Sequence, residues 1–238
     1  MNAHTCKVSI IAPAYNEQDC LPKLVEEIKK AMAPTDITYE ILLVDDASKD
    51  RTAEVIRELA EQNPEVRGLF HRINCGQSAS LATGFRNAEG EVLATLDADL
   101  QNPPHEIPRL LALLTEDFDA VCGVRTKRND TAMRRLQSKI ANGYRDWITG
   151  VPVCDAGCNL RILRRDALNE IIVFNGMHRF LTTMLKLQGL KVLESEIAHD
   201  SRLAGISKYG FGNRVWRGIE DCIAMRWYRK RCFPAGRT

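Results

Sequence analysis

Short apolar runs alternate with helical patterns along the first 125 residues, and this alternation constrains the fold more than any other feature of the chain. Each apolar run has the length of one strand, and each interval has room for one amphipathic helix. This order predicts an α/β fold with a mostly parallel sheet and helices on both faces. The predicted strands are Val8–Ala12, Tyr39–Val44, Val66–Phe70, Val92–Leu96 and Ala120–Val124, and the predicted helices are Cys20–Met32, Thr52–Gln62, Gln77–Asn87 and His105–Leu114.

The second half of the chain is less regular, without an internal repeat or a Gly/Ser linker. With 238 residues, 45% of them hydrophobic, the chain can bury one large core. We expect one domain over residues 1–211 and a basic amphipathic helix with a tail over residues 212–238. The remaining predicted elements are helices Ala132–Ile148, Phe180–Leu187 and Asn213–Cys232 and strands Leu160–Leu163 and Lys191–Ile197.

Polar side chains collect where the first five predicted strands end. In a parallel sheet these carboxyl ends meet at one edge, and the loops there form the binding crevice. We therefore expect five loops to build a single site. The loop residues are Pro13-Ala14-Tyr15-Asn16-Glu17, Asp45-Asp46, Asn74-Cys75-Gly76-Gln77, Asp97–Gln101 and Gly123-Val124-Arg125.

Two carboxylates, Asp97 and Asp99, follow the fourth predicted strand, and the amide of Gln101 comes two residues later. Carboxylates at the end of a buried strand cost desolvation energy unless a positive group meets them. Hard oxygen ligands suit Mg²⁺ or Mn²⁺, and a phosphorylated substrate would carry such a cation. An Asp helix cap explains one carboxylate but not the pair with its amide, so we favour a site for a metal and a diphosphate.

Asp45 and Asp46, after the second predicted strand, allow two interpretations. They can begin a turn, or they can accept hydrogen bonds from a ribose or a base. Beside the Asp97–Gln101 motif, the nucleotide interpretation is favoured. The chain contains neither GxGxxG nor GxxxxGK[ST], so neither a dinucleotide fold nor a P-loop is predicted.

Cations occur at the same edge and in a later loop. Arg125 follows the fifth predicted strand, where its guanidinium can pair with a phosphate or remain solvated. Further on, the segment Arg202–Gly210 combines Arg202 and Lys208 with two glycines. This composition is typical of a mobile loop that closes over an anionic substrate, and also of a polar surface loop.

The last 38 residues contain nine Lys or Arg against two acidic residues, which indicates an anionic partner. Their predicted helix combines apolar residues at helical spacing with tryptophans and cations. This pattern fits a membrane interface, and it also fits packing on the protein's own core; both can hold along one helix. No apolar run is long enough for a spanning helix. The eight cysteines contain no CxxC pair and indicate reduced cytosolic thiols.

Taken with their spacing, these motifs resemble those of glycosyltransferase family 2 enzymes with the GT-A fold. More narrowly, the chain is similar to the branch of that family that glycosylates polyprenyl phosphates, which includes dolichyl-phosphate mannose synthase. The resemblance covers nearly the whole chain. It rests on Pro13–Glu17, Val44–Asp50, Asn74–Gln77, Asp97–Pro104, Asp155–Arg161 and Gly205–Tyr209.

The resemblance implies a role for individual residues of the predicted site. The metal and the donor diphosphate would be held by Asp97, Asp99 and Gln101. The catalytic set would be Asp97, Asp99, Arg125 and Asp155, with Asp155 orienting the acceptor. The nucleotide-sugar site would comprise Pro13, Tyr15, Glu17, Val44, Asp45, Asp46, Asp97, Ala98, Asp99, Arg125, Arg202 and Lys208.

The resemblance also implies a reaction and its partners. We expect metal-dependent, inverting transfer of one sugar from a UDP- or GDP-sugar to a polyprenyl phosphate, catalysed by a peripheral protein at the cytoplasmic membrane face. Many relatives continue into transmembrane helices, whereas this sequence stops at Thr238. Lipid access would then need the final helix at the bilayer or a separate membrane subunit, and a homo-oligomer is compatible with the sequence.

Other functions were weighed against this expectation. In one alternative, the same sugar transfer uses a soluble or other cell-envelope acceptor. In another, the protein is a catalytically silent partner of a membrane subunit. A processive synthase is disfavoured because Ile223 stands where its QxxRW motif needs Gln before Arg226-Trp227. Nucleic acid is not an expected partner, since the basic residues lack interleaved aromatic platforms.

Overall fold

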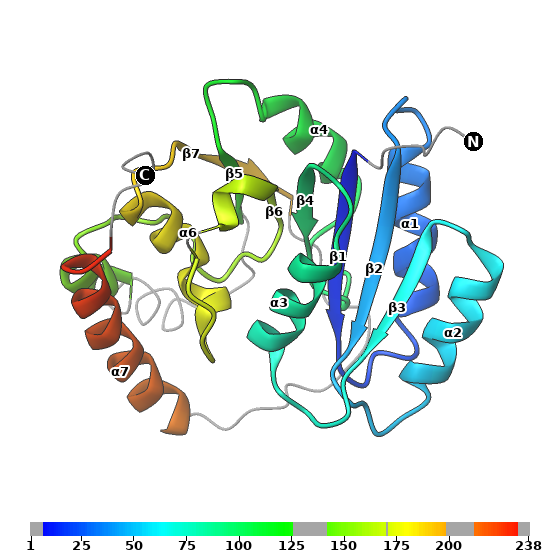
Figure 1. Ribbon diagram of the computed structural model, residues 1–238, viewed down its shortest axis with the longest axis horizontal. Coiled ribbons are helices and arrows are strands. Elements are labelled where there is room, and N and C mark those ends of the chain that lie inside the picture. The colour runs from blue at the N-terminus through cyan, green and yellow to red at the C-terminus, as the bar shows by residue number, and fades with distance from the viewer. Residues whose placement is uncertain (1–6, 126–141, 170, 199–211, 233–238) are drawn as a thin grey trace.

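The computed structural model describes residues 7–125, 142–169, 171–198 and 212–232 and shows a seven-stranded sheet covered by helices on both faces (Figure 1). The strand order is β3-β2-β1-β4-β6-β5-β7. The strands are β1 (Val8–Ala14), β2 (Tyr39–Asp45), β3 (Val66–Phe70), β4 (Val92–Thr95), β5 (Ala120–Arg125), β6 (Arg161–Arg164) and β7 (Val192–Ile197). The helices are α1 (Leu21–Met32), α2 (Thr52–Gln62), α3 (Gln77–Asn87), α4 (Glu106–Leu113), α6 (Met177–Leu187) and α7 (Gly212–Arg229), with a helix at residues 142–149 and a short 3-10 helix at Arg165–Leu168.

A single strand, β6, runs against the other six. It pairs antiparallel with β4 on one side and with β5 on the other, while the remaining pairs are parallel. The prediction of a mostly parallel sheet is confirmed. Because β6 is reversed, its first residues lie at the edge where β1, β2, β4 and β5 end, so this edge gathers residues from both halves of the chain.

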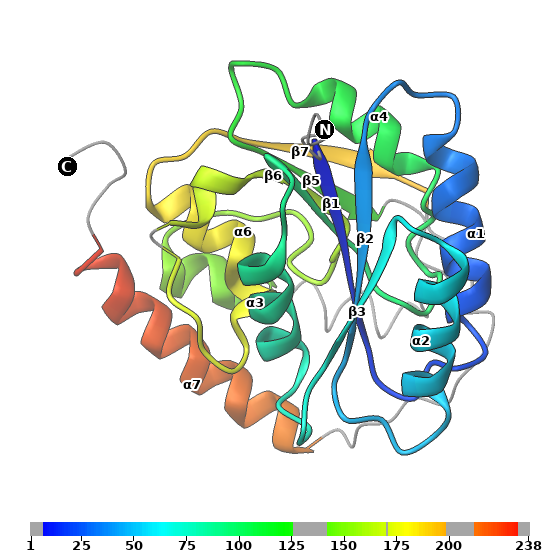
Figure 2. The ribbon, with the colours of Figure 1, turned by 45° about the vertical axis from the view of Figure 1, so that its right-hand side comes forward.

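Two apolar layers hold the helices to the sheet, and successive strand residues alternate between them. Ile10 and Ile41 face α1, α2 and α4, whereas Ile11 and Leu42 face α3, α6 and α7. The layers are visible in the turned view, where α1 and α2 lie on one side of the sheet and α3, α6 and α7 on the other (Figure 2). Strands β1, β2 and β4 are therefore buried on both faces, which explains why they read as nearly continuous apolar runs.

Most predicted elements agree with the structure to within one or two residues, and α2, β3 and α3 agree at both ends. Helix α6 begins at Met177, earlier than its apolar pattern indicated, because Gly176 starts it in a left-handed conformation with φ of 110°. Part of the predicted helix Ala132–Ile148 lies outside the described residues. In the part of the chain that is described, no helix combines the length and the apolar character needed to cross a bilayer.

Glu194 on β7 carries a charge-dependent part of the stability. Burial alone would raise its pKa, but hydrogen bonds from Cys154 and the ammonium of Lys186 outweigh burial and hold the pKa below its ordinary value. The stability that Glu194 contributes through its lowered pKa is fully present above the pKa that this carboxyl has in the unfolded chain. It is lost as the pH falls through the lower pKa of the folded protein.

We therefore expect Glu194→Gln to lower the free energy of unfolding by about 1–2 kcal/mol near neutral pH and by less below about pH 4. Urea titrations at the two pH values measure the difference. The exposed Glu116, changed to Gln, serves as control. An equal loss at both pH values would show that the charge of Glu194 is not the cause.

Candidate active site

Backbone strain gathers at the carboxyl edge of the sheet. Asn16 after β1, Ala47 after β2 and Leu100 after β4 have left-handed backbone, with φ of 53°, 56° and 60°. These are the only non-glycine residues with positive φ in the described ranges. A residue with a Cβ pays roughly 1–2 kcal/mol for this conformation, and such strain clusters at binding and catalytic sites. The strained turns thus mark the edge at which the sequence predicts a site.

Asp97, the first carboxylate of the predicted metal motif, is held by two amide side chains. Nε2 of Gln77, the first residue of α3, donates to its Oδ1 at 2.7 Å. Nδ2 of Asn159, which precedes β6, lies 3.0 Å from Oδ1 and 3.1 Å from Oδ2. These contacts hold the Asp97 carboxylate, just after β4, between the start of α3 and the segment that precedes β6.

A fully buried arginine lies behind Asn159. Nη1 of Arg161 donates to Oδ1 of Asn159 at 3.2 Å, and Nη2 donates to the carbonyl oxygen of His178 at 2.9 Å. No carboxylate of a described residue forms an ion pair with Arg161, and its Nε has no hydrogen-bond partner among those residues. The uncompensated positive charge therefore favours the ionised form of Asp97.

Asp99 is 7% exposed, and its Oδ1 accepts the backbone N–H of Gln101 at 3.1 Å because the left-handed Leu100 turns the chain back. Burial, and after it the charge of Asp99, raise the pKa of Asp97 above its ordinary value. A divalent cation would favour the charged form of both carboxylates. Asp97, Asp99 and Gln101 supply the hard oxygens that Mg²⁺ or Mn²⁺ prefers, so the residues present fit such an ion.

Arg125 and Asp155, two members of the predicted catalytic set, form one ion pair. Nε of Arg125 donates to Oδ2 of Asp155 at 2.7 Å, and Nη2 donates to Oδ1 at 2.9 Å. The side chains are 11% and 9% exposed. Gly157 leaves room for the pair, since a Cβ there would lie 2.7 Å from Nη2 of Arg125. The bidentate geometry orients the guanidinium at the end of β5.

Asp46 anchors the loop that follows β3. Its Oδ1 accepts the N–H of Cys75 and contacts Nδ1 of His71, both at 2.8 Å, and its Oδ2 accepts the N–H of Gly76 at 2.7 Å. One ligand atom from each of Asp46, His71 and Cys75 lies within 4.8 Å of the others. These hydrogen bonds close the loop after β3 onto the end of β2, so we assign this group to loop geometry.

Two other predicted residues contribute their side chains to the core. Val44 is fully buried against the layer with α3, and Ala98, 3% exposed, is buried in the layer with α1. A nucleotide contact at either position would therefore involve the backbone. Asp45 is 3% exposed, and its Oδ1 accepts the N–H of Ser48 at 3.2 Å, which is the turn geometry that the sequence left open.

The loop after β1 is joined to the loop after β2. The N–H of Glu17 donates to Oγ1 of Thr52 at 2.9 Å, which ties the first predicted loop to the start of α2. Pro13, Tyr15 and Glu17 are half-buried, so they remain accessible to a ligand. Arg202 and Lys208 lie outside the described residues, and their roles stay predictions.

Gln77, Asn159 and Arg161 are candidate site residues to which the sequence assigned no role. Gln77 ends the Asn74–Gln77 motif, and the other two belong to the Asp155–Arg161 motif. Asn159 is 62 residues away from Asp97 along the chain. The structure brings Asn159 and Arg161 toward Asp97 because the reversed strand β6 pairs with β4. The periodicity of the sequence contains no signal for that pairing.

The site and its supporting sheet define a class of protein. A mostly parallel α/β sheet with paired acids, amides and a fixed guanidinium at its carboxyl edge is the arrangement of a GT-A-like fold. The model of the family described as glycosyl transferase family 2 matches residues 9–172. The chain belongs to glycosyltransferase family 2.

Several relatives share most of this chain. It is 38% identical over 207 residues to the undecaprenyl-phosphate 4-deoxy-4-formamido-L-arabinose transferase of Proteus mirabilis, which covers 86% of this chain and 63% of the relative. It is 41% identical over 204 residues to the protein of the same name from Pseudomonas fluorescens, over 85% of this chain and 60% of the relative. The chain thus spans about three fifths of the length of these relatives.

Solved structures confirm the GT-A-like fold. The mannosyltransferase PcManGT of Pyrobaculum calidifontis, in complex with GDP-Man and Mn²⁺, superposes with a TM-score of 0.63 at 19% identity, over 94% of this chain and 64% of its own. Glucosyl-3-phosphoglycerate synthase of Mycobacterium tuberculosis, in complex with phosphoglyceric acid, gives a TM-score of 0.70 at 14% identity, over 94% of this chain and 79% of its own.

Proposed function

We propose that this protein transfers a single sugar from a nucleotide-sugar donor to a polyprenyl phosphate, with Mg²⁺ or Mn²⁺ at Asp97, Asp99 and Gln101. The observation that carries the proposal is the Asp97 carboxylate at the end of β4, fixed by Gln77 and Asn159 next to Asp99. Relatives named undecaprenyl-phosphate transferases support the acceptor, and structural neighbours solved with GDP- or UDP-sugars and Mn²⁺ support the donor and the metal.

The proposed chemistry relies on charge placement. The bound cation would neutralise the diphosphate as it leaves, which lowers the barrier without a proton transfer to the donor. Asp97 and Asp99 would hold that cation, and the rigid sheet edge keeps them in register with the loop after β1. Arg125, fixed by Asp155, presents a guanidinium to phosphate oxygens.

The acceptor needs little activation. A phosphate monoester carries most of its second negative charge near neutral pH, because its second pKa is about 6. In-line attack by its oxygen on the anomeric carbon, with departure of the nucleoside diphosphate, would invert that centre. The site therefore has to position the acceptor and has no need of a strong general base.

Nucleotide binding gives a first test. Thermal melting is measured with UDP or GDP, each with Mn²⁺, with Mg²⁺ or with a chelator. We expect one nucleotide to raise Tm only when a divalent cation is present, because a ligand that binds the folded state alone stabilises it. Asp99→Asn should lose this rise. If neither nucleotide shifts Tm with either cation, the proposal is overturned.

The two amides beside Asp97 give a second prediction. Asn159→Ala and Gln77→Ala each remove a hydrogen bond that orients Asp97, so we expect each to lower kcat/KM for sugar transfer by about 10- to 100-fold, as changes behind a metal ligand typically do. The exposed Asn87→Ala, at the far end of α3, is the control. Wild-type kcat/KM in both variants, with Mn²⁺ affinity unchanged, would refute a positioning role.

A further inference from the structure

Helix α7 presents two chemically different faces in its described part. Cys222, Met225 and Tyr228 are buried in the layer that covers the sheet. Ile223 and Trp227, four residues apart and therefore neighbours on the helix surface, are 57% and 62% exposed. The helix thus packs on its own core with one side and exposes large apolar side chains with the other.

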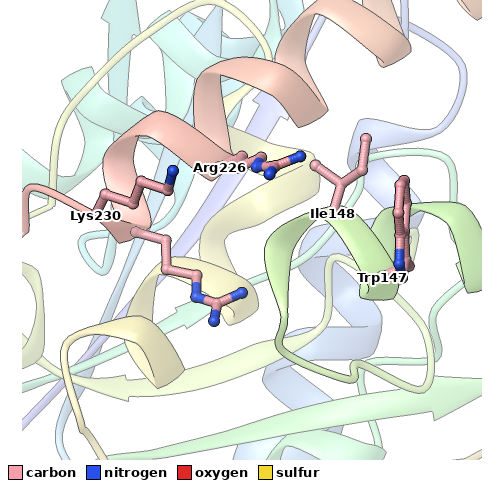
Figure 3. A pocket seen from close by; sticks show the side chains of 5 residues that line it. Trp147, Ile148, Arg226 and Lys230 are labelled. Carbon is pink, nitrogen blue, oxygen red and sulfur yellow. The ribbon is translucent and has the colours of Figure 1, made fainter.

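A shallow pocket lies between α7 and the helix at residues 142–149. It has a volume of about 250 Å³ and is lined by Trp147, Ile148, Arg226, Arg229 and Lys230. Figure 3 shows Arg226 and Lys230 on α7 and Trp147 and Ile148 on the other helix. The pocket therefore combines three cations with one exposed indole.

The cations of the pocket have no acidic partner among the residues that the structure describes. Nη1 of Arg229 donates to the carbonyl oxygen of Thr149 at 3.4 Å, and the glycine at 150 leaves room for its guanidinium. In the described ranges, no carboxylate forms an ion pair with Arg226, Arg229 or Lys230. Three close positive charges without a counter-charge attract an anionic ligand.

Aromatic side chains border the same pocket. Trp147 is 74% exposed and Tyr144 is 38% exposed, with ring centroids 6.4 Å apart. On α7, the exposed Ile223 and Trp227 lie within one helical turn of Arg226 and Lys230, respectively. Tryptophan and tyrosine favour the boundary between headgroups and acyl chains, because one end of the ring is apolar and the other forms hydrogen bonds.

We infer that this surface, made of Tyr144, Trp147, Ile223, Arg226, Trp227 and Lys230, docks on a membrane through anionic phospholipid headgroups. A headgroup phosphate would occupy the pocket while the indoles enter the interface. Lipid is favoured over an acidic protein because the apolar residues are dispersed among the cations instead of forming one groove. The inference rests on the proposed function, because a polyprenyl-phosphate acceptor resides in a membrane.

The test measures co-sedimentation of the full chain with phosphatidylcholine vesicles, with and without phosphatidylglycerol. We expect binding only to the anionic vesicles, and weakening as salt is raised. Arg226→Ala/Lys230→Ala should reduce vesicle affinity about thirtyfold, since each cation contributes to attraction by an anionic surface. Trp147→Ala/Trp227→Ala should reduce it about tenfold or more. Lys23→Ala/Lys30→Ala, which removes the same charge from α1, should bind like wild type.

Defined outcomes would overturn the inference. These are equal binding to neutral and anionic vesicles, wild-type binding by a folded Arg226→Ala/Lys230→Ala variant, or a wild-type dimer that the tryptophan substitutions dissociate. Arg226→Lys, which keeps the charge, should retain binding and so separates charge from folding. Vesicle binding needs neither donor nor acceptor. Sugar transfer to a detergent-solubilised acceptor without vesicle binding would therefore refute the docking surface alone, and binding without transfer would refute the proposed function alone.

Discussion

Replacing Asp99 by asparagine is expected to lower kcat/KM for sugar transfer by about a hundredfold to a thousandfold, the usual loss when one preorganised electrostatic group is removed from a site. Asparagine keeps the shape of the side chain and an oxygen that can accept the N–H of Gln101, which Asp99 now binds at 3.1 Å. The variant therefore removes charge and little else. Initial rates over a range of Mn²⁺ and donor concentrations measure the effect.

The same substitution should leave the fold intact or make it more stable. The charge of Asp99 raises the pKa of Asp97, which means that the two carboxylates repel each other in the folded protein. Removing one of them relieves that repulsion, so Tm without metal should stay the same or rise. The exposed Asp117→Asn, in the loop between α4 and β5, should change neither quantity. A folded Asp99→Asn variant with wild-type kcat/KM would show that Asp99 has no part in the reaction.

Replacing Arg125 by methionine is expected to lower the free energy of unfolding by about 3–5 kcal/mol, because the carboxylate of Asp155 would remain buried without its cation. Both side chains of this pair are largely buried, and two hydrogen bonds join them. Urea unfolding measures the loss. Arg51→Met, which breaks a solvent-exposed pair with Glu54, should cost about 1 kcal/mol or less.

A double-mutant cycle separates the pair from its surroundings. Asp155→Leu alone leaves Arg125 unpaired, whereas Arg125→Met/Asp155→Leu leaves neither charge behind. The sum of the two single losses in the free energy of unfolding should therefore exceed the loss in the double variant by about 1–3 kcal/mol. If the three values are additive instead, the ion pair does not position Arg125.

Much of the fold follows from the sequence because its signals are local. The central strands are buried on both faces, so runs such as Ile41–Val44 stand out against the amphipathic helices between them. Placing Asp97, Asp99 and Arg125 at one edge then required only that the sheet be mostly parallel. The confirmed direction of β5, parallel to β4 although β6 separates them, keeps Arg125 at that edge.

The contacts between the loops are not local, and they were not predicted. Asn159 reaches Asp97 only because β6 runs antiparallel to β4, and the short pattern Leu160–Leu163 does not reveal the direction of the strand. Asp46 illustrates the opposite case. Its position after β2 was predicted, but the structure shows both carboxylate oxygens bound within the protein, through long-range contacts with Cys75 and Gly76.

The most direct test of the account is transfer of a radiolabelled sugar to undecaprenyl phosphate by the purified full chain, with Mn²⁺ or Mg²⁺ and a panel of UDP- and GDP-sugars. We expect one lipid-linked monosaccharide, which disappears with a chelator and with Asp99→Asn. A folded protein that binds a nucleotide with Mn²⁺ but forms no glycolipid from any donor of the panel would contradict it.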